Sequence, residues 1–182
     1  MHRIPPKVDV RFVRLAGGQN DGSDNGRGGV GDGALSSAQV RALLEAIVPA
    51  ERTLVFVNTT VGAVQAREVL ASAGYSVQGL HSGAGNSRDE WKRNLAAFNA
   101  PESGVASGLA VDVLVCTDKA ARGVDFRSVD HVVQVDFALN AVDYIHRNGR
   151  TGRAGAAGRV TGTMAFVVMM LFVMMVAMND EE

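Results

Sequence analysis

The chain has 182 residues, which is enough for one hydrophobic core but not for two. Its formal net charge is -1, and 47% of its residues are hydrophobic and 5% aromatic, which is typical of an ordinary globular protein and excludes a basic nucleic-acid arm or an acidic tail. Any anion-binding site must therefore be a local one. The single cysteine, Cys116, excludes an internal disulfide framework and fits a reducing compartment or the interior of an organelle.

Residues 1–35 are predicted to be an N-terminal segment that precedes the main domain. Within it, Val8 to Leu15 has apolar residues that alternate over part of its length, a pattern typical of a short strand. The stretch from Ala16 to Gly33 is rich in Gly, Asp and Asn, and we interpret it as a disordered insertion or linker because it has almost nothing to bury. A phosphate-cradling loop is the alternative, but the stretch lacks the Gly-Lys-Ser/Thr that such a loop needs.

Residues 36–168 alternate short apolar runs with amphipathic helical patterns. The apolar runs predict strands at 53–57, at a run ending near 81, and at 111–116, 129–137 and 159–167, while helical spacing predicts helices over 36–48, 61–73, 88–99 and around 142–147. Because strands that alternate with helices usually pair in parallel, the sequence predicts an α/β fold with a mostly parallel sheet covered by helices on both faces.

Polar residues directly follow several of these apolar runs. In open α/β sheets, ligands bind outside the carboxyl ends of the strands, so these residues are expected to gather at one edge. They are Asn58, Thr59, His81, Thr117, Asp118 and Asp136. Each of them taken alone is better explained as a turn former than as a ligand, because every strand must end in something polar.

The sequence DYIHRNGRTGRAG, from Asp143 to Gly155, places Arg147, Arg150 and Arg153 at intervals of three, and a glycine precedes each of the last two. Glycine lets the backbone approach a ligand closely, and planar guanidinium groups reach phosphate oxygens in pairs of hydrogen bonds. A collagen repeat is excluded because the run contains no proline. The remaining alternative is a solvated basic face, which would add little stability. The spacing favours a phosphate site.

Five blocks carry a resemblance to a known family: TLVFVNT, LHSG, VDVLVCTDKAARGVDF, VDHVVQVDF and YIHRNGRTGRAG. They occur in the order and spacing of the second RecA-like domain of DEAD-box RNA helicases, within helicase superfamily 2, over about Leu54 to Gly162. The stretch VVQVDFALNAVDYIHR resembles plant organellar members most. The resemblance implies a RecA-like fold and favours a chloroplast or mitochondrion, with nucleus or cytoplasm as the alternative.

The resemblance also implies roles for individual residues, together with ATP and Mg²⁺ as cofactors and RNA as a partner. Arg150 and Arg153 match the catalytic arginine fingers, which reach the γ-phosphate of ATP held mainly, with its Mg²⁺, by a first RecA-like domain. The positions implied to bind ATP are Arg122, Asp125, Arg150 and Arg153. Those implied to couple the two domains are Asp136, His146 and Arg147, and those implied to contact RNA phosphates and sugars are Asn58, Thr59, Arg88, Thr117 and Gly123.

The sequence departs from the family pattern in two places near these residues. His81 is followed by Ser82, where the family usually has His-Gly and then a Gln-x-x-Arg segment, so Arg88 is the nearby candidate for the RNA-contacting arginine. Asn148 replaces a residue that is commonly aliphatic.

The motifs of a first RecA-like domain are missing from the sequence. It contains no Gly-x4-Gly-Lys-Ser/Thr and no Asp-Glu-Ala-Asp or similar acidic run to hold Mg²⁺. We therefore expect either a fragment of a longer helicase or a chain whose partner supplies the other half, and no useful ATP hydrolysis by this chain alone. The alternatives are a non-enzymatic RNA-binding or regulatory half-helicase and, less favoured, a DNA helicase of the same superfamily.

The C-terminal region contains an unbroken apolar run from Met164 to Met178. It is short of the roughly 20 residues that an upright transmembrane helix needs. We expect a buried last strand near Arg159 to Val167, followed by an apolar tail at 169–182, rather than a membrane anchor.

Overall fold

The computed structural model describes residues 7–15, 33–81, 87–100 and 111–164. In this part of the chain, six strands form one sheet in the order β1-β6-β5-β2-β4-β3, and every neighbouring pair is parallel. The strands are β1 Val8–Arg14, β2 Thr53–Val57, β3 Val77–Leu80, β4 Val113–Thr117, β5 His131–Gln134 and β6 Gly158–Met164. The helices are α1 Ser37–Ala46, α2 Thr60–Ser72, α3 Arg88–Phe98, α4 Asp118–Ala121 and α5 Ala141–Asn148, followed by a short 3-10 turn, η2, at Arg153–Gly155.

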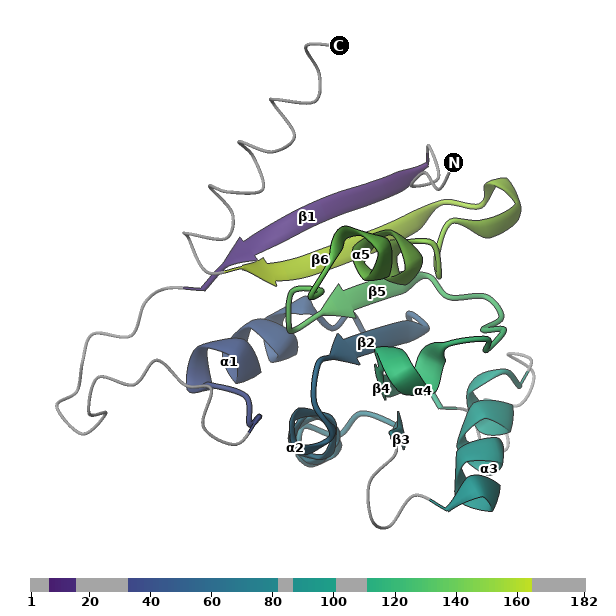
Figure 1. Ribbon diagram of the computed structural model, residues 1–182, viewed down its shortest axis with the longest axis horizontal. Helices are drawn as coiled ribbons and strands as arrows, with labels where there is room; N and C mark the ends of the chain where they lie inside the picture. The colour runs from purple at the N-terminus through teal and green to yellow at the C-terminus, as the bar shows by residue number, and fades with distance from the viewer. Residues whose placement is uncertain (1–6, 16–32, 82–86, 101–110, 165–182) are drawn as a thin grey trace, which may run out of the picture.

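Helices cover both faces of the sheet, which explains why its central strands are continuous apolar runs. Every residue of β2 and β4 is buried. Alternate β2 residues such as Val55 face a core that includes residues of α1 and α2, whereas Leu54 and Phe56 face a second core that includes residues of α3 and α4. Figure 1 shows α5 in front of β5. These features confirm the predicted α/β, RecA-like architecture. Burial of apolar side chains stabilises the packing of helices on both faces of the sheet.

The N-terminal strand β1 belongs to the same sheet as the rest of the domain. It pairs with β6 along its whole length, from Val8 opposite Gly158 to Arg14 opposite Met164 (Figure 1). Val8 and Val10 also pack against the core on the α3 side. The N-terminal segment, which is predicted to precede the main domain, thus supplies an edge strand of its sheet. The domain limits at residues 36 and 168 stay a prediction.

Most predicted boundaries agree with the structure to within two or three residues. The strand at Thr53–Val57 and the start of α3 at Arg88 are as predicted. The run 129–137 forms a shorter strand, β5, because Val129 precedes the ladder and accepts a hydrogen bond from Thr151 Oγ1 at 2.6 Å. The glycine-rich stretch from 16 to 32 and the apolar tail at 169–182 lie outside the described residues. Among the helices that the structure describes, none is long and apolar enough to cross a membrane.

Candidate functional site

Arg147 joins the carboxyl ends of three strands. Its side chain is 1% exposed, and its guanidinium donates to both carboxylate oxygens of Asp118, at 2.8 and 2.6 Å. It also donates to the side-chain oxygen of Asn58 at 2.7 Å and to the main-chain oxygen of Asp136 at 2.6 Å. These acceptors follow β4, β2 and β5 respectively, so three of the polar residues predicted to share one edge do lie together there.

The sequence of α5 explains how an arginine comes to be buried at this edge. Asn140 caps the helix by accepting a hydrogen bond from the main-chain N–H of Asp143 at 2.8 Å. The helix then buries Tyr144, Arg147 and Asn148. A buried guanidinium is costly unless every donor is paired, and the bidentate bond to Asp118 provides the largest share of that pairing.

Asp136 lies at the same edge, where its carboxylate connects β5 to two other elements. One oxygen accepts from the Gln39 side chain of α1 at 2.6 Å, and the other accepts from the main-chain N–H of Asn58 at 2.8 Å. The Asn58 side chain donates to the main-chain oxygen of Phe137 at 3.1 Å. In this structure the polar groups at the edge therefore bond mainly to one another. The predicted coupling role of Asp136 and Arg147 stays a prediction.

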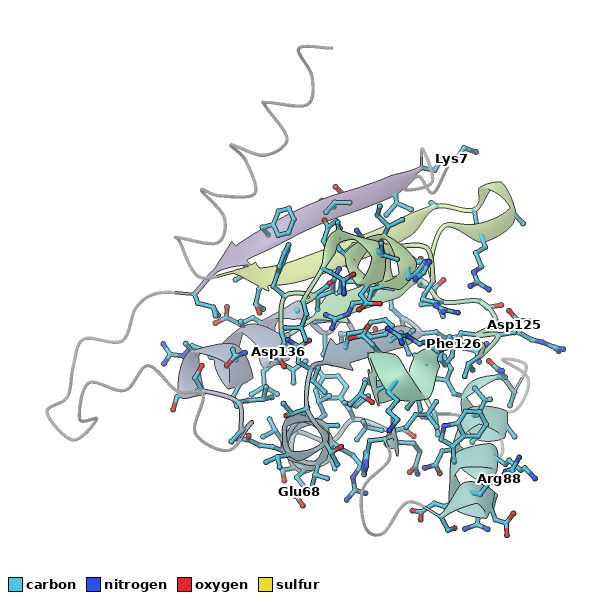
Figure 2. All side chains as sticks on the ribbon, viewed as in Figure 1. Lys7, Glu68, Arg88, Asp125, Phe126 and Asp136 are labelled. Atoms are coloured by element: carbon cyan, nitrogen blue, oxygen red, sulfur yellow. The ribbon has the colours of Figure 1, made fainter. Side chains whose placement is uncertain are left out.

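Of the other residues predicted to contact RNA, Thr59 and Thr117 lie at the ends of β2 and β4 and Gly123 follows α4, whereas Arg88 lies on α3. Thr59 caps α2 by accepting from the Gly62 N–H at 3.0 Å, and its hydroxyl donates to the main-chain oxygen of Gly33. Thr117 is buried at the end of β4 beside Val57 of β2. Gly123 is exposed in the loop after α4, with a φ of 72° that favours glycine. Arg88 is exposed at the start of α3, well below Asp125 and Asp136 in Figure 2. Their roles stay predictions.

The predicted finger arginines form a second cluster, with the loop after α4. Arg150 donates to the main-chain oxygen of Val124 at 2.7 Å, and its guanidinium lies 5.6 Å from the centre of the Phe126 ring. Arg153 donates to the carboxylate of Asp125 at 2.9 Å and to the main-chain oxygen of Gly149 at 3.1 Å. Burial, and then the nearby charge of Arg153, lower the pKa of Arg150 from its ordinary value.

The two clusters differ in exposure and in place. The Arg153 side chain is 44% exposed and that of Asp125 is 77% exposed, in contrast to the buried Arg147. Figure 2 shows Asp125 and Asp136 on opposite sides of the view, with α4 between them. Of the three arginines that the sequence spaces evenly, Arg147 is thus buried, Arg150 is partly buried and Arg153 faces solvent.

The remaining predicted residues lie on or near α5 and β3. Arg122 pairs with Asp143 at 3.2 Å, and the pKa of Asp143 is lowered first by its hydrogen bond with Asn140 and then by Arg122. His146 is exposed on α5. His81 is buried at the end of β3, where burial and then Arg67 lower its pKa.

Sequence reasoning missed two residues of the buried edge network, Gln39 and Gln134. Gln134 bonds to Arg147 and Asn148. Its signal was present, since it is the one polar residue within the run VVQV. The signal of Gln39 was weaker, because an amide three residues after Ser36 is explained by the helix cap alone, and both hydrogen bonds of that cap are present.

The sequence and the fold match those of known proteins. The helicase conserved C-terminal domain matches residues 38–155. DEAD-box ATP-dependent RNA helicase 22 of Arabidopsis thaliana is 43% identical over 129 residues, which are 68% of this chain and 20% of that protein. The protein of the same name from Oryza sativa subsp. japonica is 39% identical over 173 residues, which are 88% of this chain and 25% of that protein. The chain thus spans about a fifth to a quarter of the length of these curated relatives.

Solved structures share the fold. The yeast DEAD-box splicing factor Prp28 superposes with a TM-score of 0.64 at 21% identity, over 88% of this chain and 30% of that one. The E. coli DEAD-box protein SrmB, solved with regulator of ribonuclease activity A, superposes with a TM-score of 0.56 at 27% identity, over 86% of this chain and 76% of that one. Since the family match covers more than half of the sequence, the chain belongs to the helicase conserved C-terminal domain family, as a C-terminal RecA-like domain of the DEAD-box type.

Proposed function

We propose that this domain is the C-terminal half of an ATP-dependent RNA helicase, which binds the RNA backbone and supplies Arg150 and Arg153 to ATP held by a first RecA-like domain. One observation carries the proposal: both arginines lie on one turn beside the exposed carboxylate of Asp125. The relatives named above are ATP-dependent RNA helicases by name. We also propose a chloroplast or mitochondrial location, with nucleus or cytoplasm as the alternative.

The side chains around this turn suit the ribose and the phosphates of a nucleotide. A carboxylate accepts hydrogen bonds from ribose hydroxyls, and a guanidinium binds phosphate oxygens in pairs. Asp125 and Arg153 pair with each other in this structure, but an exposed ion pair is worth only about 0–1 kcal/mol, so a nucleotide can replace it at little cost. Arg122 lies on the same loop and is 71% exposed.

Magnesium is assigned to the other domain. Among the residues that the structure describes, no group of three or more His, Cys, Asp or Glu side chains is placed to hold a metal ion. When bound with ATP, Mg²⁺ would neutralise charge on the phosphates. The contribution of this chain is then to position Arg150 and Arg153 on the transferring phosphoryl group.

RNA is proposed to run along the ends of β2 and β4 and the loop after α4. Asn58, Thr59 and Thr117 follow or end neighbouring strands, and Gly123 exposes its backbone nearby in sequence. Groups of this kind contact phosphates and sugars, which gives affinity without base preference. Arg88 adds a positive charge from α3.

The test is Arg153→Lys in a two-domain protein that joins this chain to the first RecA-like domain of a DEAD-box relative. Lysine keeps the charge but loses the planar fork, so ATP turnover should fall on the order of tenfold or more while RNA affinity is unchanged. Arg127→Lys is the matched control, because Arg127 is exposed in the same loop region and has no assigned role. Equal losses in turnover and RNA affinity, or no loss in either, would remove Arg153 from the nucleotide site.

A non-enzymatic RNA-binding module is the second candidate, favoured by the absence of a Gly-x4-Gly-Lys-Ser/Thr sequence from the chain. The two-domain protein separates the candidates. A module predicts RNA binding with no ATP turnover that depends on Arg150 or Arg153. Stronger binding to single-stranded DNA than to RNA would instead favour a DNA helicase of the same superfamily.

A further inference from the structure

A pair of buried side-chain amides lies directly behind Arg147. Gln134 on β5 and Asn148 at the end of α5 are both 0% exposed. The Gln134 amide nitrogen donates to the Asn148 side-chain oxygen at 2.6 Å, and the Gln134 side-chain oxygen accepts from Arg147 Nη1 at 3.3 Å. The Gln134 carboxamide on β5 therefore bridges two consecutive side chains of α5, Arg147 and Asn148.

The direction of these hydrogen bonds matters, because a carboxamide has a donor end and an acceptor end. Arginine can only donate, so it needs the oxygen of Gln134 to face it. With its oxygen toward Arg147, the Gln134 amide turns its nitrogen toward Asn148, whose side-chain oxygen accepts from it and so supports this orientation. Without an acceptor at 148, the buried Gln134 nitrogen loses its partner in this pair, and the orientation that Arg147 needs is no longer supported by a second hydrogen bond.

Apolar packing alone would not place an amide at this position. The sheet face that carries Gln134 also carries Phe56 and Val132, which are almost completely buried. An amide buried in such surroundings is destabilising unless its hydrogen bonds are made, so a hydrophobic residue would serve packing better. The amide pair instead adds an acceptor for a guanidinium that also lies 5.2 Å from the centre of the Phe56 ring.

We propose that Gln134 and Asn148 are positioning residues, which hold the Arg147 guanidinium in the orientation at which it bonds to Asp118 and Asn58. The proposal rests on the proposed function in one respect, since Asn58 is taken to contact RNA. Arg147 Nη2 bonds to Asn58 at 2.7 Å, and the same guanidinium receives support from Gln134 through Nη1. Through Arg147, the amide pair thus fixes the position of the Asn58 side chain, which follows β2 and is proposed to contact RNA.

The experiment uses the 182-residue chain with Asn148→Leu, Gln134→Met and the double variant. Hydrogen exchange of the Arg147 Nε–H, followed by ¹⁵N NMR, reports the order of the guanidinium, and urea unfolding reports stability. Asn148→Leu should speed that exchange on the order of tenfold, because a charge-assisted hydrogen bond is weakened. The double variant should regain stability over Asn148→Leu, since both buried amides are gone, while the exchange stays fast.

Thr151→Val is the matched control for a purely structural effect. Thr151 is buried on the turn after α5, and its hydroxyl bonds to the main-chain oxygens of Val129 and Asp130, at 2.6 and 3.1 Å. It should lower stability while the Arg147 exchange stays slower than in Asn148→Leu. Equal exchange in the two variants would overturn the proposal. Asn148→Asp, which keeps the acceptor oxygen, should hold the exchange close to that of the unmodified chain, and it decides the question if Asn148→Leu does not fold.

Binding of a single-stranded oligouridine RNA is the second readout. Affinity should fall several-fold in Asn148→Leu and in the double variant but stay unchanged in Thr151→Val. If the unmodified chain binds no RNA, the proposed function fails while the exchange data still test the positioning role. If RNA binds and its affinity is the same in every variant, the link from the amide pair to the RNA site is wrong.

Discussion

His131 is a fully buried histidine at the start of β5, at the end of the sheet opposite Arg147. Its Nε2 atom lies 2.8 Å from the Thr161 hydroxyl, and its Nδ1 atom lies 3.8 Å from a Glu51 carboxylate oxygen. Glu51 in turn pairs with Arg159 at 2.9 Å. Burial, and then the charge of Arg159, lower the pKa of His131 to about 4.

The lowered pKa makes stability depend on pH in a definite direction. An unfolded histidine titrates near pH 6.5, so below that pH the unfolded chain binds a proton that the folded chain does not. The stabilisation is complete above pH 6.5 and is lost as the pH falls toward 4, by about 3 kcal/mol at most. Urea unfolding at pH 7, 6, 5 and 4 measures it. His131→Gln cannot titrate, and its unfolding free energy should fall less over this range; parallel curves would contradict the assignment.

Asp125 and Arg153, by contrast, are exposed, so substituting Asp125 should affect ATP binding more than stability. The ion pair between them joins two solvent-facing side chains at 2.9 Å. Pairs of this kind contribute about 0–1 kcal/mol, so Asp125→Asn should change the free energy of unfolding by less than about 1 kcal/mol. In the two-domain protein the same substitution should weaken ATP binding, because a neutral amide accepts a hydrogen bond from a ribose hydroxyl less strongly than a carboxylate does. A large loss of stability with unchanged ATP affinity would show that the pair is structural.

At the scale of elements, Arg147 links α5 to three strands of the sheet. This one side chain bonds to groups that follow β2, β4 and β5. Arg147→Met should destabilise the domain by about 3–5 kcal/mol, because the Asp118 carboxylate loses its buried partner. Chemical denaturation measures the change, and Arg127→Met, at an exposed arginine, is the control and should change little. A loss below about 1 kcal/mol would show that water replaces the guanidinium.

At the scale of the whole molecule, near-neutral charge limits how tightly the chain binds RNA. The net charge is -1, so attraction depends on local arginines rather than on an overall basic field. We expect weak binding to single-stranded RNA that falls linearly in log affinity against log salt and varies little with base sequence. Fluorescence anisotropy at several salt concentrations checks this. Tight, salt-insensitive binding to one sequence would indicate base recognition by another surface.

ATP turnover is also a property of a larger assembly than this chain. The sequence has two candidate finger arginines but no phosphate-cradling Gly-Lys-Ser/Thr loop. The purified chain should therefore show negligible RNA-stimulated ATP hydrolysis, measured by phosphate release. Joining it to a first RecA-like domain should restore turnover, and Arg150→Ala should abolish it again. Robust turnover by the chain alone, lost on Arg150→Ala, would contradict a shared catalytic site.

The sequence by itself determined the fold class and the central strands. Residues 53–57 form a strand at the predicted positions because a strand buried on both faces must be a continuous apolar run, which is a local signal. The start of α3 at Arg88 was equally readable, since the Ser87 hydroxyl caps the helix and the first turn is acidic. The arginine fingers and the RNA contacts came from the motifs, and their roles stay predictions.

Only the tertiary structure decided how the evenly spaced arginines divide. Spacing alone does not show that Arg147 turns inward to Asp118 while Arg153 faces solvent, because the outcome depends on which strand ends lie beneath α5. The pairing of β1 with β6 joins residues about 150 positions apart, and no local pattern encodes such a contact. The role of Gln134 was hidden for the same reason: a single polar residue in an apolar run gains its meaning from the partner that folding places across from it.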